Sequence, residues 1–290
     1  MSEPAPNAAD GSTGRRPRSF LGRVRRDLLV SLGVLTVLAW ALTLYRAQVM
    51  NMPMGIAVRG GVTADGMSGM AMAGMSAGGW SFGGAVIFLA VWTVMMTAMM
   101  LPATAPMMLM FAAAQARRGH DVAIPTWIFI AGYVLVWAAI GLLVYVLVQA
   151  GSDAATSLGA ATRARWAPLA LGTTLIVAGL YQFTPLKRVC LSHCRSPMAF
   201  VAQHWRGGRR GALEMGIRHG AYCLGCCWAL FAVLVATGVM SMAWMLLLTL
   251  VVFVEKVLPM GQHAAAAIGV SFVAFGVAVA SGATAMPGLA

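Results

Sequence analysis

Apolar runs long enough to cross a lipid bilayer recur along this chain, and they limit its fold more than any other feature. A helix of about 20 residues spans the hydrocarbon core, and within lipid only helices and closed barrels satisfy every backbone polar group. The chain is 60% hydrophobic and 10% charged, which excludes an ordinary soluble domain. We therefore predict an all-α fold, a polytopic transmembrane helical bundle over residues 28–283 with about seven spans. The predicted spans are 28–49, one that starts near 80, 124–148, 166–183, 219–239, 243–258 and 263–280. Whether the last one crosses fully or is re-entrant stays open.

The basic residues predict the orientation of this bundle. Of 20 Lys and Arg, all but Arg46, Arg59, Arg163 and Arg165 fall at or beside one side of the predicted topology. By the positive-inside rule that side is the cytosol, so we expect a multi-pass inner or plasma membrane protein with a cytoplasmic N-terminus. Residues 1–27 then form a disordered basic cytosolic tail, and 184–218 form a basic cytosolic connection. The net charge of +12 is expected to meet anionic lipids and no nucleic acid.

All five cysteines lie in two short segments, VCLSHC at 189–194 and HGAYCLGCCW at 219–228. On a helix with about 100° per residue, the ligand-type side chains of the second segment share one face, and Cys190 and Cys194 form an i,i+4 pair. Thiolate and imidazole select Cu(I) or Zn(II) over hard cations. The predicted topology places both segments at the cytosolic side, where thiols stay reduced. The predicted ligands are Cys190, His193, Cys194, His219, Cys223, Cys226 and Cys227.

Methionine is concentrated in two other places. The predicted outer loop 50–79 carries Met50, Met52, Met54, Met67, Met70, Met72 and Met75. Thioether sulfur is an uncharged soft ligand that suits Cu(I). The second span carries two i,i+4 pairs, Met95 with Met99 and Met96 with Met100, which we predict to lie at the depth of the thiols as further ligands. Pro102 and Pro106 should kink or end this helix.

Two alternatives to metal binding remain open at these residues. Free Cys packs well in buried helices, or can be acylated beside a membrane, and Met fills helix interfaces. Near the end of the sixth span, Glu255 and Lys256 are adjacent and therefore face different partners. For Glu255 we favour an ion pair with an Arg of the connection 184–218.

Four segments together resemble a known family: MMTAMMLPATAP, TPLKRVCLSHCRSP, YCLGCCWAL and WMLLLTLVVFVEKVLP. They resemble the predicted metal-binding integral membrane proteins of domain of unknown function 2182. The resemblance covers about 80–259 and implies a helical membrane protein with a metal site, but no reaction. The spaced Met pair of the second span is also similar to the Met motif of eukaryotic high-affinity copper transporters, which indicates ligand chemistry alone.

These observations lead to one functional hypothesis with two rivals. We predict a membrane protein that transports or otherwise handles Cu(I), with zinc as a second candidate ion. It would exchange copper with a copper chaperone or a membrane cuproenzyme. The first rival is a membrane thiol-disulfide oxidoreductase, and the second is a non-catalytic accessory subunit. The chain has no phosphate-binding Gly loop and no convincing acid/base pair, so apart from the redox alternative we expect no enzyme.

Overall fold

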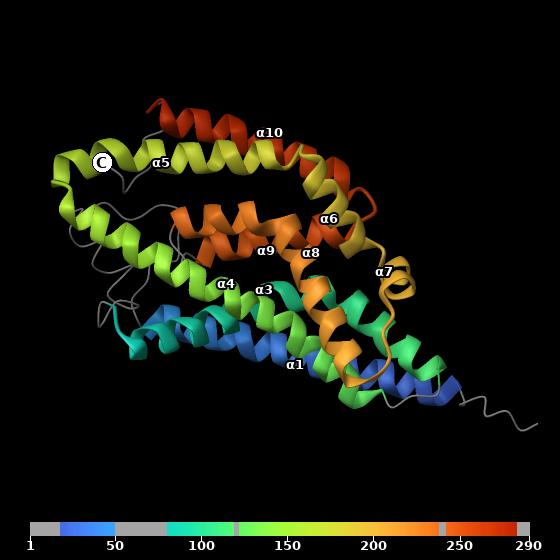
Figure 1. Cartoon of the computed structure of the whole chain (residues 1–290). Helices are drawn as coiled ribbons and strands as arrows, with labels where there is room; N and C mark the ends of the chain where they lie inside the picture. The colour runs from blue at the N-terminus through green and yellow to red at the C-terminus, as the bar shows by residue number, and fades with distance from the viewer. Residues whose placement is uncertain (1–17, 50–79, 119–121, 238–241, 283–290) are drawn as a thin grey trace, which may run out of the picture.

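The computed structural model describes residues 18–49, 80–118, 122–237 and 242–282, and all its regular elements there are α-helices. The predicted all-α fold is thus confirmed. The elements are α1 (Arg18–Val49), α3 (Phe82–Arg117), α4 (Ala123–Ser157), α5 (Ala160–Tyr181), α6 (Pro185–Arg195), α7 (Pro197–His204), α8 (Gly208–Thr237), α9 (Met242–Val257) and α10 (Gly261–Ala280) (Figure 1).

Fewer helices could cross a membrane than the seven that we predicted. In the described part of the chain, five are long and apolar enough: α1, α3, α4, α8 and α10. A sixth span is possible if α5 and α6 count as one, although they meet at a bend of 65°. Helix α9, a predicted span, has 16 residues. At 1.5 Å per residue it rises about 24 Å, which is less than the hydrocarbon thickness of about 30 Å.

The helices form two groups that meet at α8. Helix α1 packs on α3, α3 on α4 and α4 on α8, whereas α5 lies along α10 (Figure 1). The second pair is held close by glycines, since a Cβ atom on Gly179 would come within 2.6 Å of the Gly269 carbonyl oxygen. Small residues at such contacts let two backbones approach, as is common in membrane helix pairs. Helix α6 then turns back from α5 and packs on α8.

Helix α3 continues through its two prolines, so of the two predicted outcomes, a kink or an end, the end is excluded. Both Pro102 and Pro106 lie inside it. A proline has no backbone N–H, so the carbonyl four residues earlier loses its donor. For Pro102 that carbonyl belongs to Ala98, and the indole Nε1 of Trp40 on α1 donates a hydrogen bond to it at 3.1 Å. A neighbouring helix therefore supplies the donor that proline removes, as membrane helices allow.

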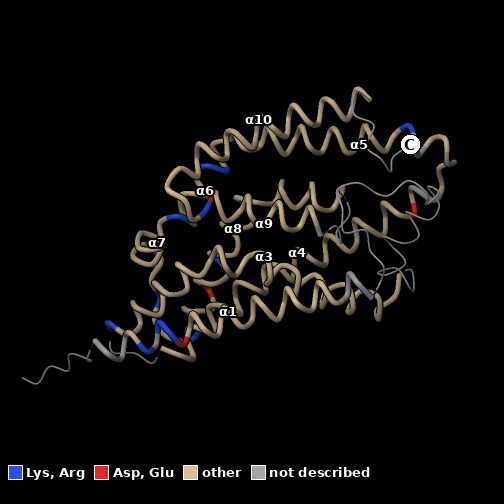
Figure 2. The backbone as a smooth tube through the Cα atoms, turned by 180° about the vertical axis from the view of Figure 1, so that it is seen from behind, with Lys and Arg blue, Asp and Glu red and all other residues tan. Residues whose placement is uncertain are grey.

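Basic residues gather at one end of the bundle, which we call the basic end (Figure 2). The basic end comprises the start of α1 with Arg23, Arg25 and Arg26, the end of α3 with Arg117 and Arg118, and the residues around the start of α8 with Arg206, Arg209 and Arg210. The connection 184–218 contributes α6, α7 and the first turns of α8 there. Residues 18–27, part of the expected tail, belong to α1. The rest of that tail and the Met-rich segment 50–79 lie outside the described residues.

Candidate metal centre

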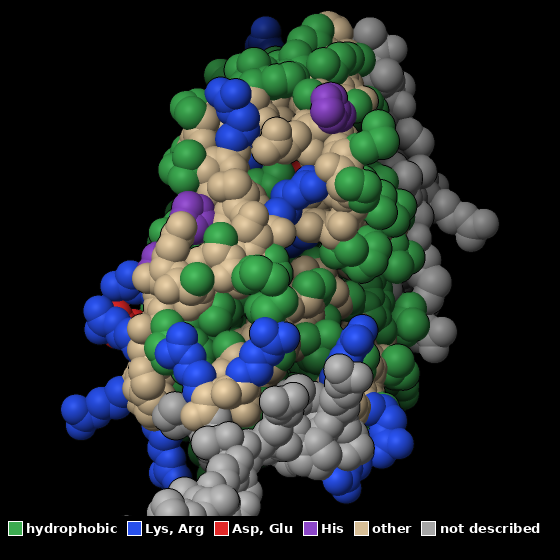
Figure 3. Space-filling view, turned by 90° about the vertical axis from the view of Figure 1, so that its right-hand side faces the viewer, with side chains coloured by type: hydrophobic (Ala, Val, Ile, Leu, Met, Phe, Trp, Pro, Cys, Tyr) green, Lys and Arg blue, Asp and Glu red, His purple; other side chains and the backbone are tan. Residues whose placement is uncertain are grey.

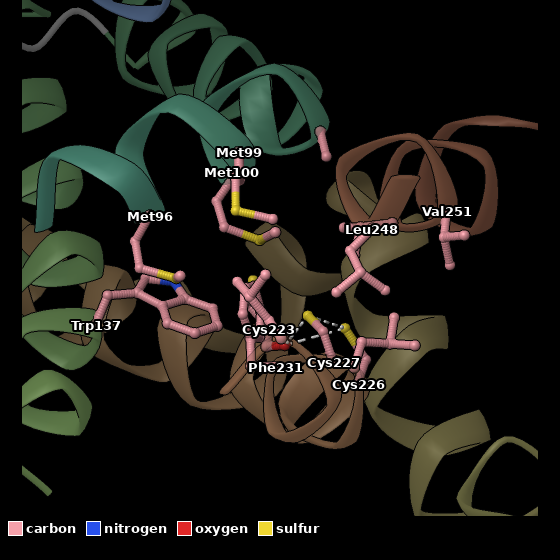
Figure 4. Close-up of a cluster of buried hydrophobic side chains, with 14 of the residues drawn as sticks. Met96, Met99, Met100, Trp137, Cys223, Cys226, Cys227, Phe231, Leu248 and Val251 are labelled. Atoms are coloured by element: carbon pink, nitrogen blue, oxygen red, sulfur yellow. Dashed lines mark hydrogen bonds between the residues drawn. The ribbon is translucent and has the colours of Figure 1, made fainter. Parts of the chain in front are cut away.

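Helix α8 buries the predicted ligand face. His219, Cys223, Cys226 and Cys227 are each at most 1% exposed. The thiols of Cys226 and Cys227 donate hydrogen bonds to the Cys223 carbonyl oxygen, at 3.1 and 2.7 Å, and their Sγ atoms lie 3.5 Å apart (Figure 4). The i,i+3 and i,i+4 spacing of these cysteines therefore gathers their sulfur atoms beside one turn of helix.

The cysteine segment 189–194 is helical, as the predicted i,i+4 pairing of Cys190 with Cys194 required. Helix α6 begins at Pro185 because the Thr184 hydroxyl caps it, accepting a hydrogen bond from the Lys187 backbone N–H at 3.3 Å. The helix brings Cys194 Sγ to 3.9 Å from Cys226 Sγ. Cys190 packs against the backbone of Gly225, where a Cβ atom would stand 2.6 Å from its sulfur. All five cysteines are free thiols.

The distances between thiols suit a site with few ligands. Two sulfur atoms that bind one ion at about 2.3 Å each lie no more than about 4.6 Å apart. The pairs Cys194–Cys226 and Cys226–Cys227 meet this limit. Among the residues that the structure describes, however, no three His, Cys, Asp or Glu side chains are grouped to hold a metal ion.

Methionines of α3 lie against this cluster. Met95, Met96, Met99 and Met100 are all buried, with at most 1% exposed. In Figure 4 the side chains of Met99 and Met100 extend from α3 toward the α8 thiols, and Met96 lies by Trp137. The predicted thioether stripe and the predicted thiol face thus belong to one buried region, which we call the sulfur cluster: Met99, Met100, Cys194, Cys223, Cys226 and Cys227.

A buried ammonium group joins the two parts of the sulfur cluster. Lys256 on α9 places its Nζ atom 2.9 Å from Cys223 Sγ and 3.9 Å from Met100 Sδ. The hydroxyl of Tyr133 on α4 also contacts Cys223 Sγ, at 3.1 Å. Sequence reasoning gave neither residue a role at the thiols. Each is a polar residue in an apolar helix, and the sequence alone shows that it needs a polar partner. The packing of α4 and α9 on α8 identifies this partner as Cys223.

Glu255 and Lys256 have separate partners, as their adjacency predicts. Glu255 forms a buried ion pair with Lys187 of α6 at 2.7 Å, and not with an arginine as we had favoured. Arg195 instead donates hydrogen bonds to the backbone oxygens of Glu255 and Pro259, at 3.0 and 2.8 Å. Lys187 on the first turn of α6 thus reaches the carboxylate of Glu255, while Arg195 on the last turn bonds to the backbone at the end of α9. Two contacts therefore attach α6 to the end of α9.

The two predicted histidine ligands occupy different surroundings. His219 is buried with its ring centroid 6.0 Å from that of Phe129 and 5.6 Å from that of Tyr133. Within the described residues, neither ring nitrogen has a hydrogen-bond partner. His193 is half-buried and stacks on Tyr222, with centroids 4.2 Å apart. Among the described residues, His193 thus contacts the rings of Tyr222 and His204 and the backbone of its own helix, whereas no contact with a thiol is found.

Comparison with known proteins gives one match. The sequence profile of a family described as PpoB2, copper chaperone, matches residues 89–279. The chain belongs to this copper chaperone family. The match covers all four segments that carry the sequence resemblance and every residue of the sulfur cluster, but neither α1 nor the segment 50–79. No curated protein and no solved structure matches the chain.

Membership of the copper chaperone family supports copper handling in a general sense. It agrees with the ligand chemistry, because thioether and thiolate sulfur suit copper in its reduced state. Family membership thus supports the expectation that the protein handles copper. The candidate ligands are proposed from the geometry described above.

Proposed function

We propose that this member of the copper chaperone family is a multi-pass membrane protein that binds Cu(I) in the sulfur cluster and passes it on. The observation that carries the proposal is the contact of one group, Lys256 Nζ, with both Cys223 Sγ and Met100 Sδ. It means that the thioethers of α3 and the thiols of α8 face the same buried space. An ion there could exchange one type of sulfur ligand for the other without crossing a polar barrier.

The arrangement favours Cu(I) over zinc. Structural zinc sites almost always have four ligands in a tetrahedron, usually Cys and His. The described thiols come together in pairs, and the additional sulfur nearby belongs to methionine. Cu(I) is stable with two or three soft ligands, including thioethers. A pair of thiolates and one thioether would satisfy it.

The direction of transfer follows from ligand strength. Thioethers are neutral and bind weakly, whereas thiolates are anionic and bind more strongly. We propose that Cu(I) is taken up at the Met-rich segment 50–79, passes the Met95–Met100 stripe, and is held by the thiols near the basic end, which would face the cytosol. A copper chaperone or a membrane cuproenzyme would then exchange it.

Metal analysis of purified protein tests this proposal. The full chain, reconstituted with Cu(I) under anaerobic conditions, should retain sulfur-bound copper, and a variant with all five Cys replaced by Ser should retain at least 10-fold less of this sulfur-bound copper. A Met99→Leu/Met100→Leu variant should bind more weakly but keep its thiol-bound copper. Equal copper in the wild-type and five-Ser proteins would refute the proposal, provided both elute as the same folded species.

Thiol-disulfide exchange is the second candidate, because Cys226 Sγ lies within 3.9 Å of sulfur atoms on both α6 and α8. Labelling of free thiols separates the two functions. Protection that appears with Cu(I) and without disulfide formation supports copper binding. Protection that requires an oxidant and is reversed by a reductant supports the redox function.

A further inference from the structure

His193 and His204 lie beside each other at the basic end. They come from consecutive short helices, α6 and α7, and their ring centroids are 6.3 Å apart. Both side chains are half-buried. The molecular face at this end carries histidine side chains among Lys and Arg (Figure 3). Sequence reasoning grouped His193 with the thiols and gave His204 no role, because α7 was not foreseen.

Both rings are held with the same nitrogen turned to the backbone. His193 Nδ1 lies 2.8 Å from the Val189 carbonyl oxygen, and His204 Nδ1 lies 3.2 Å from the Phe200 carbonyl oxygen. A carbonyl only accepts hydrogen bonds, so each Nδ1 must carry the proton. The neutral imidazole then has its lone pair on Nε2. This is the tautomer that metal-binding histidines use when the second nitrogen is fixed by a backbone oxygen.

The separation of the rings suits one ion between them. An imidazole bound through Nε2 places its ring centroid about 3.2 Å from the metal, so two rings on one ion in a near-linear arrangement lie about 6.3 Å apart. Tyr222 restrains both rings, stacking on His193 at 4.2 Å and meeting His204 edge-on at 6.2 Å. The two rings are thus held at a separation that one ion could bridge.

The charge of the surroundings selects the ion. Two neutral imidazoles bring no negative charge, and α6 carries Arg188 and Arg195. A divalent cation would be repelled about twice as strongly as a monovalent one. Imidazole is also an accepted ligand of copper. The pair is thus suited to Cu(I), which tolerates two ligands in a line.

Aromatic contacts lead from this pair toward the sulfur cluster. Phe200 stacks on His204 with centroids 4.9 Å apart and meets buried His219 edge-on at 5.5 Å. His219 in turn stacks near Tyr133, whose hydroxyl contacts Cys223 Sγ. His219 has two unpartnered ring nitrogens among the described residues. A buried polar group without a partner commonly marks the place of an unseen ligand.

From this arrangement we propose that His193 and His204 form a separate Cu(I) site at the basic end, with His219 between it and the sulfur cluster. The site would exchange copper with a partner before or after the thiols hold it. The proposal rests on the proposed copper function but involves different ligands. It therefore predicts nitrogen-bound copper that does not depend on cysteine.

Cu(I) titration of the purified full chain in detergent, against bicinchoninate as the competing chelator, tests the pair. The His193→Ala/His204→Ala variant should bind one Cu(I) equivalent fewer than wild type. The same loss should appear when both chains also have all five Cys replaced by Ser. His263→Ala, which changes an exposed histidine of α10, is the matched control and should lose none.

X-ray absorption at the copper edge supplies a second readout. The five-Ser chain should show a low-coordinate nitrogen contribution that the added His193→Ala/His204→Ala change removes. Unchanged stoichiometry and unchanged nitrogen scattering in both backgrounds would overturn the histidine site. If instead the five-Ser chain binds as much copper as wild type, the sulfur cluster fails as a copper site while the histidine pair stands.

Discussion

The ammonium of Lys256 lies 2.9 Å from the sulfur of Cys223, and both groups are buried. A buried ammonium is stable only beside compensating negative charge. Cu(I) bound by two thiolates has a net charge of −1, which this lysine would balance. Lys256 therefore belongs to the electrostatics of the sulfur cluster although it cannot itself bind the ion.

Replacement of this lysine should weaken copper binding. In Lys256→Met the side chain keeps its length and loses its charge, leaving a thiolate-bound ion uncompensated. We expect Cu(I) affinity to fall roughly 10- to 100-fold, the range seen when groups that support metal ligands are removed. Competition with bicinchoninate measures it, with the exposed Arg25→Met of α1 as control. Tighter binding would show that the ammonium competes with the ion for Cys223.

Cys226 and Cys190 should differ in importance although both are buried cysteines near α8. Cys226 lies within 3.9 Å of two other sulfur atoms, whereas Cys190 packs against Gly225. We expect Cys226→Ser to lower Cu(I) affinity at least about 10-fold and Cys190→Ser to change it far less. The two variants make the same chemical change, so each controls for the other. An equal loss in both would show that Cys190 is also a ligand.

The ion pair of Lys187 with Glu255 should matter for stability. Both side chains are at most 3% exposed, so removal of one partner leaves the other charge buried and unpaired. Lys187→Met alone should destabilise the fold by about 3–5 kcal/mol, and Lys187→Met/Glu255→Leu by much less. Thermal unfolding of the purified chains gives the comparison. If the double variant were as unstable as the single one, these two residues would stabilise the fold by more than the neutralisation of each other's charge.

Trp40 and Pro102 should be coupled through the Ala98 carbonyl. Trp40→Phe removes the indole donor to that oxygen and should cost about 1–3 kcal/mol. With Pro102→Ala, residue 102 regains an N–H that can bond to Ala98, so the tryptophan change should then cost less. A double-mutant cycle on thermal stability measures the coupling. Additive effects would argue that Trp40 acts through packing alone.

Much of the fold follows from hydropathy, since long apolar runs must be helical within lipid. The cysteine spacing likewise predicts the shared face of Cys223, Cys226 and Cys227, because helical periodicity is local. The course of α3 through Pro102 could not be predicted, because its missing hydrogen bond is replaced from α1, far away in the sequence.

The sequence predicts the sulfur-bearing side chains of the candidate site, but not the residues that contact them. Lys256 and Tyr133 reach Cys223 only because α9 and α4 pack on α8, which no local pattern encodes. His193 was grouped with the thiols because Cys194 is its neighbour. Adjacent residues point about 100° apart on a helix, so the imidazole lies with Tyr222 while the thiol faces Cys226.

The attachment of α6 to the end of α9 links two parts of the candidate metal centre. Lys187 and Arg195 both bind Glu255, the residue before Lys256. On the same short helix, Cys194 lies against Cys226. If copper binds as proposed, the eleven residues of α6 connect one candidate thiol ligand to the backbone that positions the neighbouring ammonium. A displacement of this helix would then change a ligand and its charge balance together.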